Sequence, residues 1–271
     1  MAGLRLRDLE IVESKSALAE IPEGKVLINT INAHSFNVAQ EDEAFAEALR
    51  VVDDGVLRVD KECVKYLIPD GASIVKACRW LRGKSQPRER VAGWDLFEFE
   101  MGRLERKGEE LKAKSEKSML PYRALRVMFL GSSEKVLGLI RERARVDYPC
   151  LEMVTYSPPY KAEFSEEENA EMVRAINAAQ PDLLWIGMTA PKQEKWVYGH
   201  WRELEIHCHV GTIGAVFDFY AGTAERAPRW WQEHGLEWLY RLFVEPRRMW
   251  RRYVLGNPLF VWNVGKEKRE R

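Results

Sequence analysis

Residues 181–222 read PDLLWIGMTAPKQEKWVYGHWRELEIHCHVGTIGAVFDFYAG, and this stretch indicates how the chain folds. It contains two apolar runs, 183–186 and 210–219, and each one leads into glycine and polar residues. A short apolar run followed by glycine and a helical pattern is typical of a buried parallel strand. Ligands of open α/β sheets bind beyond the carboxyl ends of such strands. We therefore expect both runs to deliver residues to a ligand-binding edge.

The chain before this stretch also alternates between strand patterns and helix patterns. Apolar patterns predict further strands at 25–31, 125–130 and 151–155, a short strand with its connection within 56–68, and helices at 41–50, 73–81, 95–118 and 165–179 and between 133 and 145. Ser73 and Ser165 are the expected helix caps. Charges of both signs along 95–118 indicate a solvated outer face. The alternation predicts an α/β fold with a mostly parallel, Rossmann-like sheet covered by helices.

The pattern changes after Gly222, where only helical segments follow. Two amphipathic candidates, 228–242 and 244–255, are divided by Glu245-Pro246, and Gly256-Asn257-Pro258 is expected to end the second one. We therefore expect a lead-in at 1–24, an α/β domain at 25–222 and a C-terminal helical appendage at 223–271.

The charge of the chain is balanced overall but uneven along its length. The 271 residues hold 42 Lys and Arg against 42 Asp and Glu, which argues against a nucleic-acid partner. Residues 226–271 carry 11 Lys and Arg against 5 Asp and Glu, a net charge of +6, and five of the ten tryptophans. A basic, Trp-rich end indicates an anionic partner together with an apolar or interfacial one, such as an anionic membrane surface.

Cysteine usage and hydropathy indicate the compartment. The four cysteines form no CxxC pair and are expected to be buried thiols in a reducing compartment. The first residues lack an apolar signal core, and no window approaches the roughly 18 apolar residues of a spanning helix. The motif His207-Cys208-His209 has metal-binding residue types, but it opens an apolar strand whose alternate residues face opposite sides, so we expect it to be structural. We expect a cytoplasmic chain that lies on a membrane surface without crossing it.

Five polar positions stand where strands or loops end. Asp70 lies in Pro69-Asp70-Gly71, a rigid turn that exposes one carboxylate, although the same tripeptide also forms plain turns. Thr30 and Asn32 close the first strand, where they serve either a ligand or the backbone. Gln193 falls in the first helical turn after Pro191. Asp218 is flanked by aromatic residues and either holds a ligand hydroxyl or caps a helix.

Several motifs resemble one known family. They are INTINA at 28–33, PDG at 69–71, APKQE at 190–194, GAVFDFYAGTAERAP at 214–228 and GLEWLYRLFVEPRRMWRR at 235–252. In this order they resemble the WecG/TagA/CpsF glycosyltransferases, bacterial enzymes of surface-polysaccharide and teichoic-acid assembly. The resemblance covers approximately residues 25–255.

The resemblance implies an activity, its partners and a location. It implies a membrane-associated inverting glycosyltransferase at the inner face of the cell membrane, with 25–222 as a nucleotide-sugar-binding domain. The donor implied is a UDP-sugar carrying N-acetylmannosamine, its uronic acid or glucose, and the acceptor is a polyprenyl-diphosphate-linked saccharide. No cofactor is implied. The sequence NAHSFN at 32–37 is more similar to the exopolysaccharide branch of the family.

The resemblance also assigns roles to residues. Asp70 is the implied catalytic base, and the matching segments 73–77 and 90–96 that follow it support this choice. The chain between Phe45 and Asp70 is longer than is usual in the family, so Asp54, in a second Asp-Gly pair, is a competing base. The implied substrate-binding residues are Thr30, Asn32, Gln193 and Asp218.

Arginines of the appendage are the expected substitute for a metal. Release of a diphosphate builds negative charge, which enzymes neutralise with a divalent metal or with arginine. The sequence holds no DxD-type acidic pair suited to a metal. Arg241, Arg248 and Arg251 share one face if the helix is continuous, although Pro246 interrupts it. We expect them to bind the diphosphate; a solvated basic face or a contact with anionic lipid is the alternative.

Two other classes of protein stay open at this point. A nucleotide-sugar epimerase or dehydrogenase on a dinucleotide-binding fold requires a GxGxxG motif after the first strand, and residues 25–37 contain no glycine. A non-catalytic module that binds a nucleotide sugar or scaffolds a polysaccharide complex is compatible with the same residues.

Overall fold

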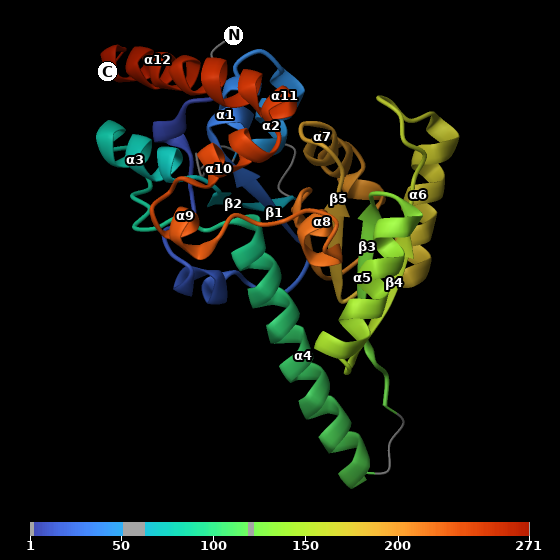
Figure 1. The fold of residues 1–271 in the computed structure, drawn as a ribbon. Coiled ribbons are helices and arrows are strands. Elements are labelled where there is room, and N and C mark those ends of the chain that lie inside the picture. Colours follow the sequence, from blue (N-terminus) through green and yellow to red (C-terminus); the bar gives the residue numbers. More distant parts are fainter. Residues whose placement is uncertain (1–2, 51–62, 119–121, 271) are drawn as a thin grey trace.

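One parallel sheet of six strands forms the centre of the molecule (Figure 1). The structure, a computed structural model, describes residues 3–50, 63–118 and 122–270. The strand order is β2-β1-β6-β5-β3-β4, and every pair is parallel. The strands are β1 Val26–Ile31, β2 Val64–Pro69, β3 Leu125–Gly131, β4 Leu151–Tyr156, β5 Leu183–Gly187 and β6 His209–Thr212. The predicted parallel α/β fold is confirmed, and the first apolar run of the opening stretch is β5.

Helices cover both faces of the sheet. The body contains α1 Ala33–Val38, α2 Glu43–Leu49, α3 Ala72–Leu81, α4 Gly93–Ser118, α5 Glu134–Asp147, α6 Glu166–Ala179, α7 Lys192–Gly199 and α8 Val216–Ala221. Alternate residues of β3 point to opposite faces, as a strand requires. Val127 and Phe129 pack with α4, α5 and α8, whereas Met128 and Leu130 pack with α6 and α7.

The second apolar run is not one strand. β6 ends at Thr212 and α8 begins at Val216, so residues 210–219 divide at Ile213, whose amide donates to Ile186 O at 3.1 Å. Two glycines let large rings close over the sheet centre. A Cβ on Gly211 would collide with the Trp185 ring, and a Cβ on Gly187 would collide with Phe217. The absence of a side chain at Gly187 therefore lets Phe217 of α8 pack against the end of β5.

The two predicted serine caps have different outcomes. Ser165 caps α6 in a capping box, because its hydroxyl accepts from Glu168 N at 3.3 Å and the Glu168 carboxylate accepts from Ser165 N at 2.7 Å. The prediction for Ser73 is wrong. α3 begins one residue earlier, at Ala72, and its cap position is Gly71, which has no side chain to accept a bond. The first amides of α3 therefore have no capping side chain.

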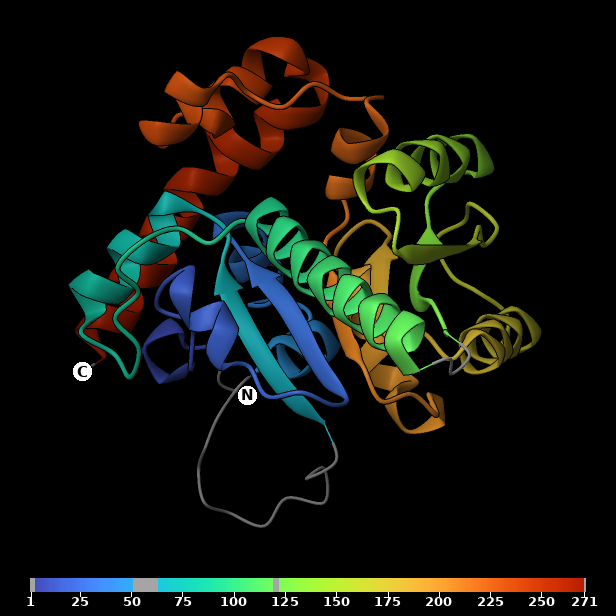
Figure 2. The ribbon, with the colours of Figure 1, turned by 90° about the horizontal axis from the view of Figure 1, so that it is seen from below.

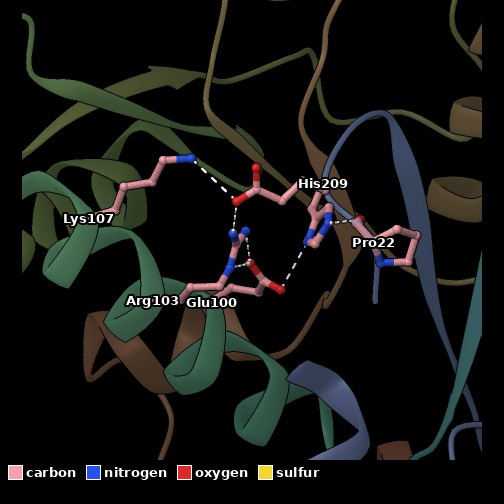
Figure 3. Close-up of polar contacts among 6 residues, drawn as sticks. Pro22, Glu100, Arg103, Lys107 and His209 are labelled. Atoms are coloured by element: carbon pink, nitrogen blue, oxygen red, sulfur yellow. Dashed lines mark hydrogen bonds and ion pairs between the residues drawn. The ribbon is translucent and has the colours of Figure 1, made fainter. Parts of the chain in front are cut away.

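Helix α4 lies across the sheet and buries one of its charges (Figures 2 and 3). Its predicted solvated face is wrong at Glu100, which is fully buried. Glu100 accepts from Arg103 at 2.7 Å and lies 3.0 Å from His209 Nδ1, while His209 Nε2 lies 2.8 Å from Pro22 O. Both ring nitrogens of His209 thus lie within hydrogen-bond distance of an oxygen. The motif at 207–209 leads into β6, as expected, and its purely structural role stays a prediction. All four cysteines are free, but only Cys78 and Cys208 are buried as expected, whereas Cys63 and Cys150 are partly exposed.

The region after Gly222 is helical, as predicted, but its boundaries differ. It contains α9 Arg229–Glu233, α10 Glu237–Val244, α11 Pro246–Trp250, a π-helical turn Arg251–Leu255 and α12 Gly256–Arg269. The expectation that Gly256-Asn257-Pro258 ends a helix is wrong, because these residues begin α12. Proline is tolerated in a first helical turn, where its missing amide would have no partner in the helix.

The two ends of the chain pack together over α1 and α3 (Figure 2). Phe260 of α12 contacts Phe36 of α1, with ring centroids 5.5 Å apart. Glu267 accepts hydrogen bonds from Leu6 N at 3.0 Å and Arg7 N at 2.8 Å. The N-terminal segment and α12 thus share one apolar cluster with the body, and the division of the chain at residues 24 and 222 stays a prediction.

Candidate functional site

A pocket of about 560 Å³ lies where β1 and β2 end. Its walls come from α1, α3, α10, the π-helical turn and α12. The carboxyl end of the parallel sheet therefore holds the pocket, as expected for this fold. Its polar side chains include Asn32, His34, Asp70, Arg90, Arg241 and Arg252.

Asp70 and Asn32 are brought together because β1 and β2 are neighbours. Pro69 pairs with Ile31, and the Asp70 amide donates to Ile31 O at 2.8 Å. Asn32 Oδ1 accepts from His34 N at 3.0 Å and so caps α1. These two predicted residues therefore line one pocket, and Asn32 also has the backbone role that was its alternative.

The charge around Asp70 is mixed. Burial raises the pKa of Asp70; Arg90 opposes this shift, Glu237 adds to it, and Arg252 and Arg241 oppose it. The net effect is that the pKa of Asp70 is raised above its ordinary value. A positioned carboxyl group with a raised pKa is suited to accept a proton from a substrate hydroxyl.

The predicted site did not include Arg90 or Glu237. Arg90 Nη1 donates to Glu237 Oε2 at 2.7 Å, and both side chains are mostly covered. The hydrogen bond from Val91 N to Pro69 O, 3.1 Å long, holds this part of the chain beside Asp70. Arg90 and Glu237 are 147 residues apart in sequence, so no local spacing links them. The only signal was that both lie within stretches that resemble the family.

We expect Glu237→Gln to move the acidic limb of the pH–rate profile to lower pH. A base acts in its ionised form, so activity falls as the pH drops below the pKa of Asp70. Removing the Glu237 charge ends its repulsion of the Asp70 carboxylate and frees Arg90, and both effects lower that pKa. The measurement is kcat/KM against pH, with the exposed Glu10→Gln as control. A limb that stays in place or moves to higher pH contradicts this arrangement.

Arg241 and Arg251 do not share one face. Arg241 lines the pocket, with its guanidinium carbon 5.8 Å from the Phe219 ring centroid. Arg251 is exposed beside the Trp250 ring and does not line the pocket, and Arg248 lies in α11 with its side chain outside the described part. Arg252 lines the pocket instead and donates to Asn32 Oδ1 at 3.5 Å. The helix is interrupted between Val244 and Pro246, so the sequence spacing of the three arginines does not predict which face each one occupies.

Thr30, Asp218 and Gln193, which were also predicted to bind the substrate, lie outside the pocket lining. Thr30 is half-buried within β1, paired with Ile68. Asp218 accepts a hydrogen bond from the Thr223 hydroxyl at 3.4 Å, and its carbonyl accepts from Thr223 N at the end of α8. The binding roles of Thr30, Asp218, Arg248 and Arg251 stay predictions, and the competing base Asp54 lies outside the described residues.

Gln193 is buried beneath the loop after β5. Its Oε1 accepts from Met188 N at 3.1 Å and its Nε2 donates to Glu194 Oε1 at 2.8 Å. Burial raises the pKa of Glu194 to about 7, and its second oxygen has no hydrogen-bond partner among the described residues. Gln193 thus orders the loop in this structure, and its contact with substrate stays a prediction.

Two features are absent from the part of the chain that the structure describes. Across residues 3–50, 63–118 and 122–270, no three His, Cys, Asp or Glu side chains cluster in a way that could hold a metal ion. None of the helices in the same ranges combines the length and the apolar character needed to span a bilayer.

A parallel sheet whose carboxyl edge places two carboxylates among three arginines is typical of α/β enzymes that act on anionic substrates. The family described as Glycosyl transferase WecG/TagA/CpsF matches residues 1–271, and the chain belongs to it. The chain is therefore a glycosyltransferase, as the resemblance implied.

Curated relatives with one shared name match most of the chain. The name is N-acetylglucosaminyldiphosphoundecaprenol N-acetyl-beta-D-mannosaminyltransferase. The Bacillus spizizenii protein is 30% identical over 204 residues, which is 75% of this chain and 69% of the relative. The Bacillus subtilis protein is 26% identical over 206 residues, or 76% and 70%. The Staphylococcus aureus protein is 25% identical over 264 residues, or 97% and 89%.

Proposed function

We propose that this enzyme transfers a sugar from a UDP-sugar to a polyprenyl-diphosphate-linked N-acetylglucosamine, with inversion, during assembly of a bacterial surface polysaccharide. N-acetylmannosamine is the first candidate for the sugar, because the relatives' names specify it; its uronic acid and glucose are the others. The observation that carries the proposal is the position of Asp70 in one pocket with Arg90, Arg241 and Arg252.

The chemistry follows from these groups. Asp70 takes the proton of the acceptor hydroxyl while that oxygen attacks the anomeric carbon, and the bond from this carbon to the diphosphate breaks. A carboxylate that takes a proton and forms no bond to the sugar leaves a single displacement, which inverts the configuration. Negative charge then grows on the leaving diphosphate, where Arg241 and Arg252 stabilise it. The first residues of α3, Ala72 and Ser73, line the same pocket, and the uncapped N-terminus of this helix adds to the field.

The direct test is transfer by the purified protein. It is incubated with N-acetylglucosamine diphosphate carrying a short alkyl chain, and with UDP-N-acetylmannosamine, its uronic acid or UDP-glucose, each with and without a chelator. We expect one donor to give a disaccharide product of inverted configuration at an unchanged rate in the chelator. Binding of every donor without product would favour a non-catalytic module, and a change in the donor sugar itself would favour an epimerase or dehydrogenase.

We expect Arg241→Gln to lower kcat/KM for the donor by roughly 10- to 150-fold, because a charge-assisted hydrogen bond contributes about 1.5–3 kcal/mol. Arg241 lines the pocket and acts on Asp70, so its charge is felt where the diphosphate leaves. Arg247→Gln is the matched control, since Arg247 is exposed on α11 and does not line the pocket. Equal kcat/KM values for the two variants would remove Arg241 from the mechanism.

We further propose that the tail holds the enzyme on the inner face of the cell membrane. Exposed large apolar side chains gather on α9–α12 and include Trp230, Phe243, Trp250, Leu259 and Trp262. Arg247 and Arg251 are exposed among them. Aromatic and basic side chains on one helical surface favour a membrane interface with anionic lipid.

We expect Phe243→Ser combined with Trp262→Ser to weaken binding to anionic phospholipid vesicles by tenfold or more, because burying one such side chain contributes about 1.5–3 kcal/mol. These side chains are 68% and 65% exposed, so the fold tolerates their removal. The exposed aromatic Tyr160, in the loop before α6, supplies the control Tyr160→Ser. Co-sedimentation measures the binding, and equal binding of both variants would exclude this surface.

A further inference from the structure

The pocket has two chemically different ends. Asp70, Arg241 and Arg252 lie at the polar end, where the transfer is proposed to occur. The pocket continues between α3 and α12, and its lining there is mainly apolar. We call this part the α3–α12 trench, lined by Ala77, Trp80, Phe260, Val261 and Val264.

The trench runs along α3 from the polar end. Ala72, beside Asp70, and Trp80 both line the pocket and are eight residues apart, which corresponds to roughly 12 Å of helix. Helix α12 lies alongside α3, and Lys268 Nζ donates to Trp80 O at 2.8 Å at the far end (Figure 2). Lys76 stands one turn from each end. The space is therefore elongated, with Asp70 and the arginines at one end, Lys76 midway along it and Lys268 at the far end.

The trench has a buried floor and an open rim. Ala77, Phe260 and Val264 are at most 6% exposed, whereas Trp80 is 52% and Val261 66% exposed. The floor side chains offer no hydrogen-bonding group, so a sugar or a base placed on them would lose its hydrogen bonds to water without replacement. A hydrocarbon chain loses nothing there and gains by leaving water.

We propose that the α3–α12 trench binds the first part of the acceptor's prenyl chain and holds the attached diphosphate toward the arginines and Asp70. This inference rests on the proposed function, because it takes the acceptor to be a lipid-linked sugar like that named for the relatives. The chain leaves over Val261, next to the exposed Leu259 and Trp262 of α12. The trench thus connects the apolar outer surface of the tail to the reacting carboxylate.

The test is acceptor chain length in the absence of vesicles. N-acetylglucosamine diphosphate analogues with alkyl chains of increasing length are compared below their micelle concentrations. We expect KM for the acceptor to fall by up to about fourfold for each methylene that the trench buries, from about 0.8 kcal/mol per group, and then to level off once the trench is full. The value of kcat stays constant, because the chain does not touch the reacting atoms.

Two variants distinguish binding in the trench from a general effect of the hydrophobicity of the analogue. Trp80→Ser combined with Val261→Ser removes the rim, and we expect it to flatten the dependence of KM on chain length while the shortest analogue reacts normally. Tyr160→Ser is the control, because Tyr160 is an exposed aromatic residue in the loop before α6 and does not line the pocket, and it should keep the dependence. Melting temperatures of all variants establish that they are folded.

The possible outcomes test the trench proposal and the proposed function separately. The trench proposal is wrong if transfer occurs with a KM that does not depend on chain length. It is also wrong if KM falls with chain length as steeply in the rim variant as in the wild type. In both cases the proposed function stands. No transfer to any analogue overturns the proposed function. In that case calorimetric binding of an alkyl diphosphate to the wild type and the rim variant decides the trench, which requires tighter binding to the wild type.

Discussion

Asp70→Asn is expected to reduce the rate of transfer by roughly 10²- to 10⁴-fold, the usual contribution of a positioned general base. Asparagine has the same shape but does not take up the acceptor proton. Affinity for UDP should be unchanged or tighter, because the variant removes a negative charge from beside Arg90, Arg241 and Arg252. Single-turnover rates and calorimetric titration with UDP measure the two quantities separately.

The pH profile adds a second test of the same residue. Burial raises the pKa of Asp70, so in the wild type the acidic limb of activity lies above the ordinary range of an aspartate. The asparagine variant should lose this limb. Asp8→Asn serves as control, since Asp8 is half exposed in the N-terminal segment and does not line the pocket. Turnover of Asp70→Asn at the wild-type rate would transfer the role of base to another carboxylate, with Asp54 next.

Glu100→Gln is expected to lower the free energy of unfolding by about 3 kcal/mol at neutral pH. Removing one member of a buried ion pair costs roughly 3–5 kcal/mol, because its partners stay buried without compensation. We expect the lower end, since Arg103 is 27% exposed and lies 3.6 Å from Glu23, to which it can turn (Figure 3). A domain of this size should lose roughly 6–12 °C in melting temperature.

The dependence on pH has a definite sign. Burial opposes ionisation of Glu100, but His209 and Arg103 outweigh it and hold its pKa below the ordinary value. The ionised carboxylate therefore stabilises the fold above its unfolded-state pKa, and this contribution is lost as the pH falls through the folded-state pKa. The difference between wild type and variant should shrink in acid.

Glu110→Gln supplies the control for this comparison, because Glu110 is exposed on the same helix. Chemical denaturation at several pH values measures all three proteins. If the two variants are equally stable at neutral pH, the buried cluster does not contribute as argued.

The sequence by itself determined most of the strands and the edge of the sheet that holds the site. Strands β1, β3, β4 and β5 and the capping box of Ser165 follow from apolar spacing and from a hydroxyl three residues before its partner. Polar residues were expected at the carboxyl edge of the parallel sheet, where ligands bind, and the choice of Asp70 among them rested on the resemblance to the family. These features depend on residues close together in the chain.

The tertiary structure alone decided which charges surround Asp70. Arg90 meets Glu237 across 147 residues, and Arg252 enters the pocket where Arg251 was expected. The break between Val244 and Pro246 resets the helical phase, so a rotation of one residue exchanges an inward arginine for an outward one. Hydrophobic periodicity specifies what a segment becomes, whereas the return path of the chain, set by packing of α12 on α1 and α3, specifies which distant side chains meet.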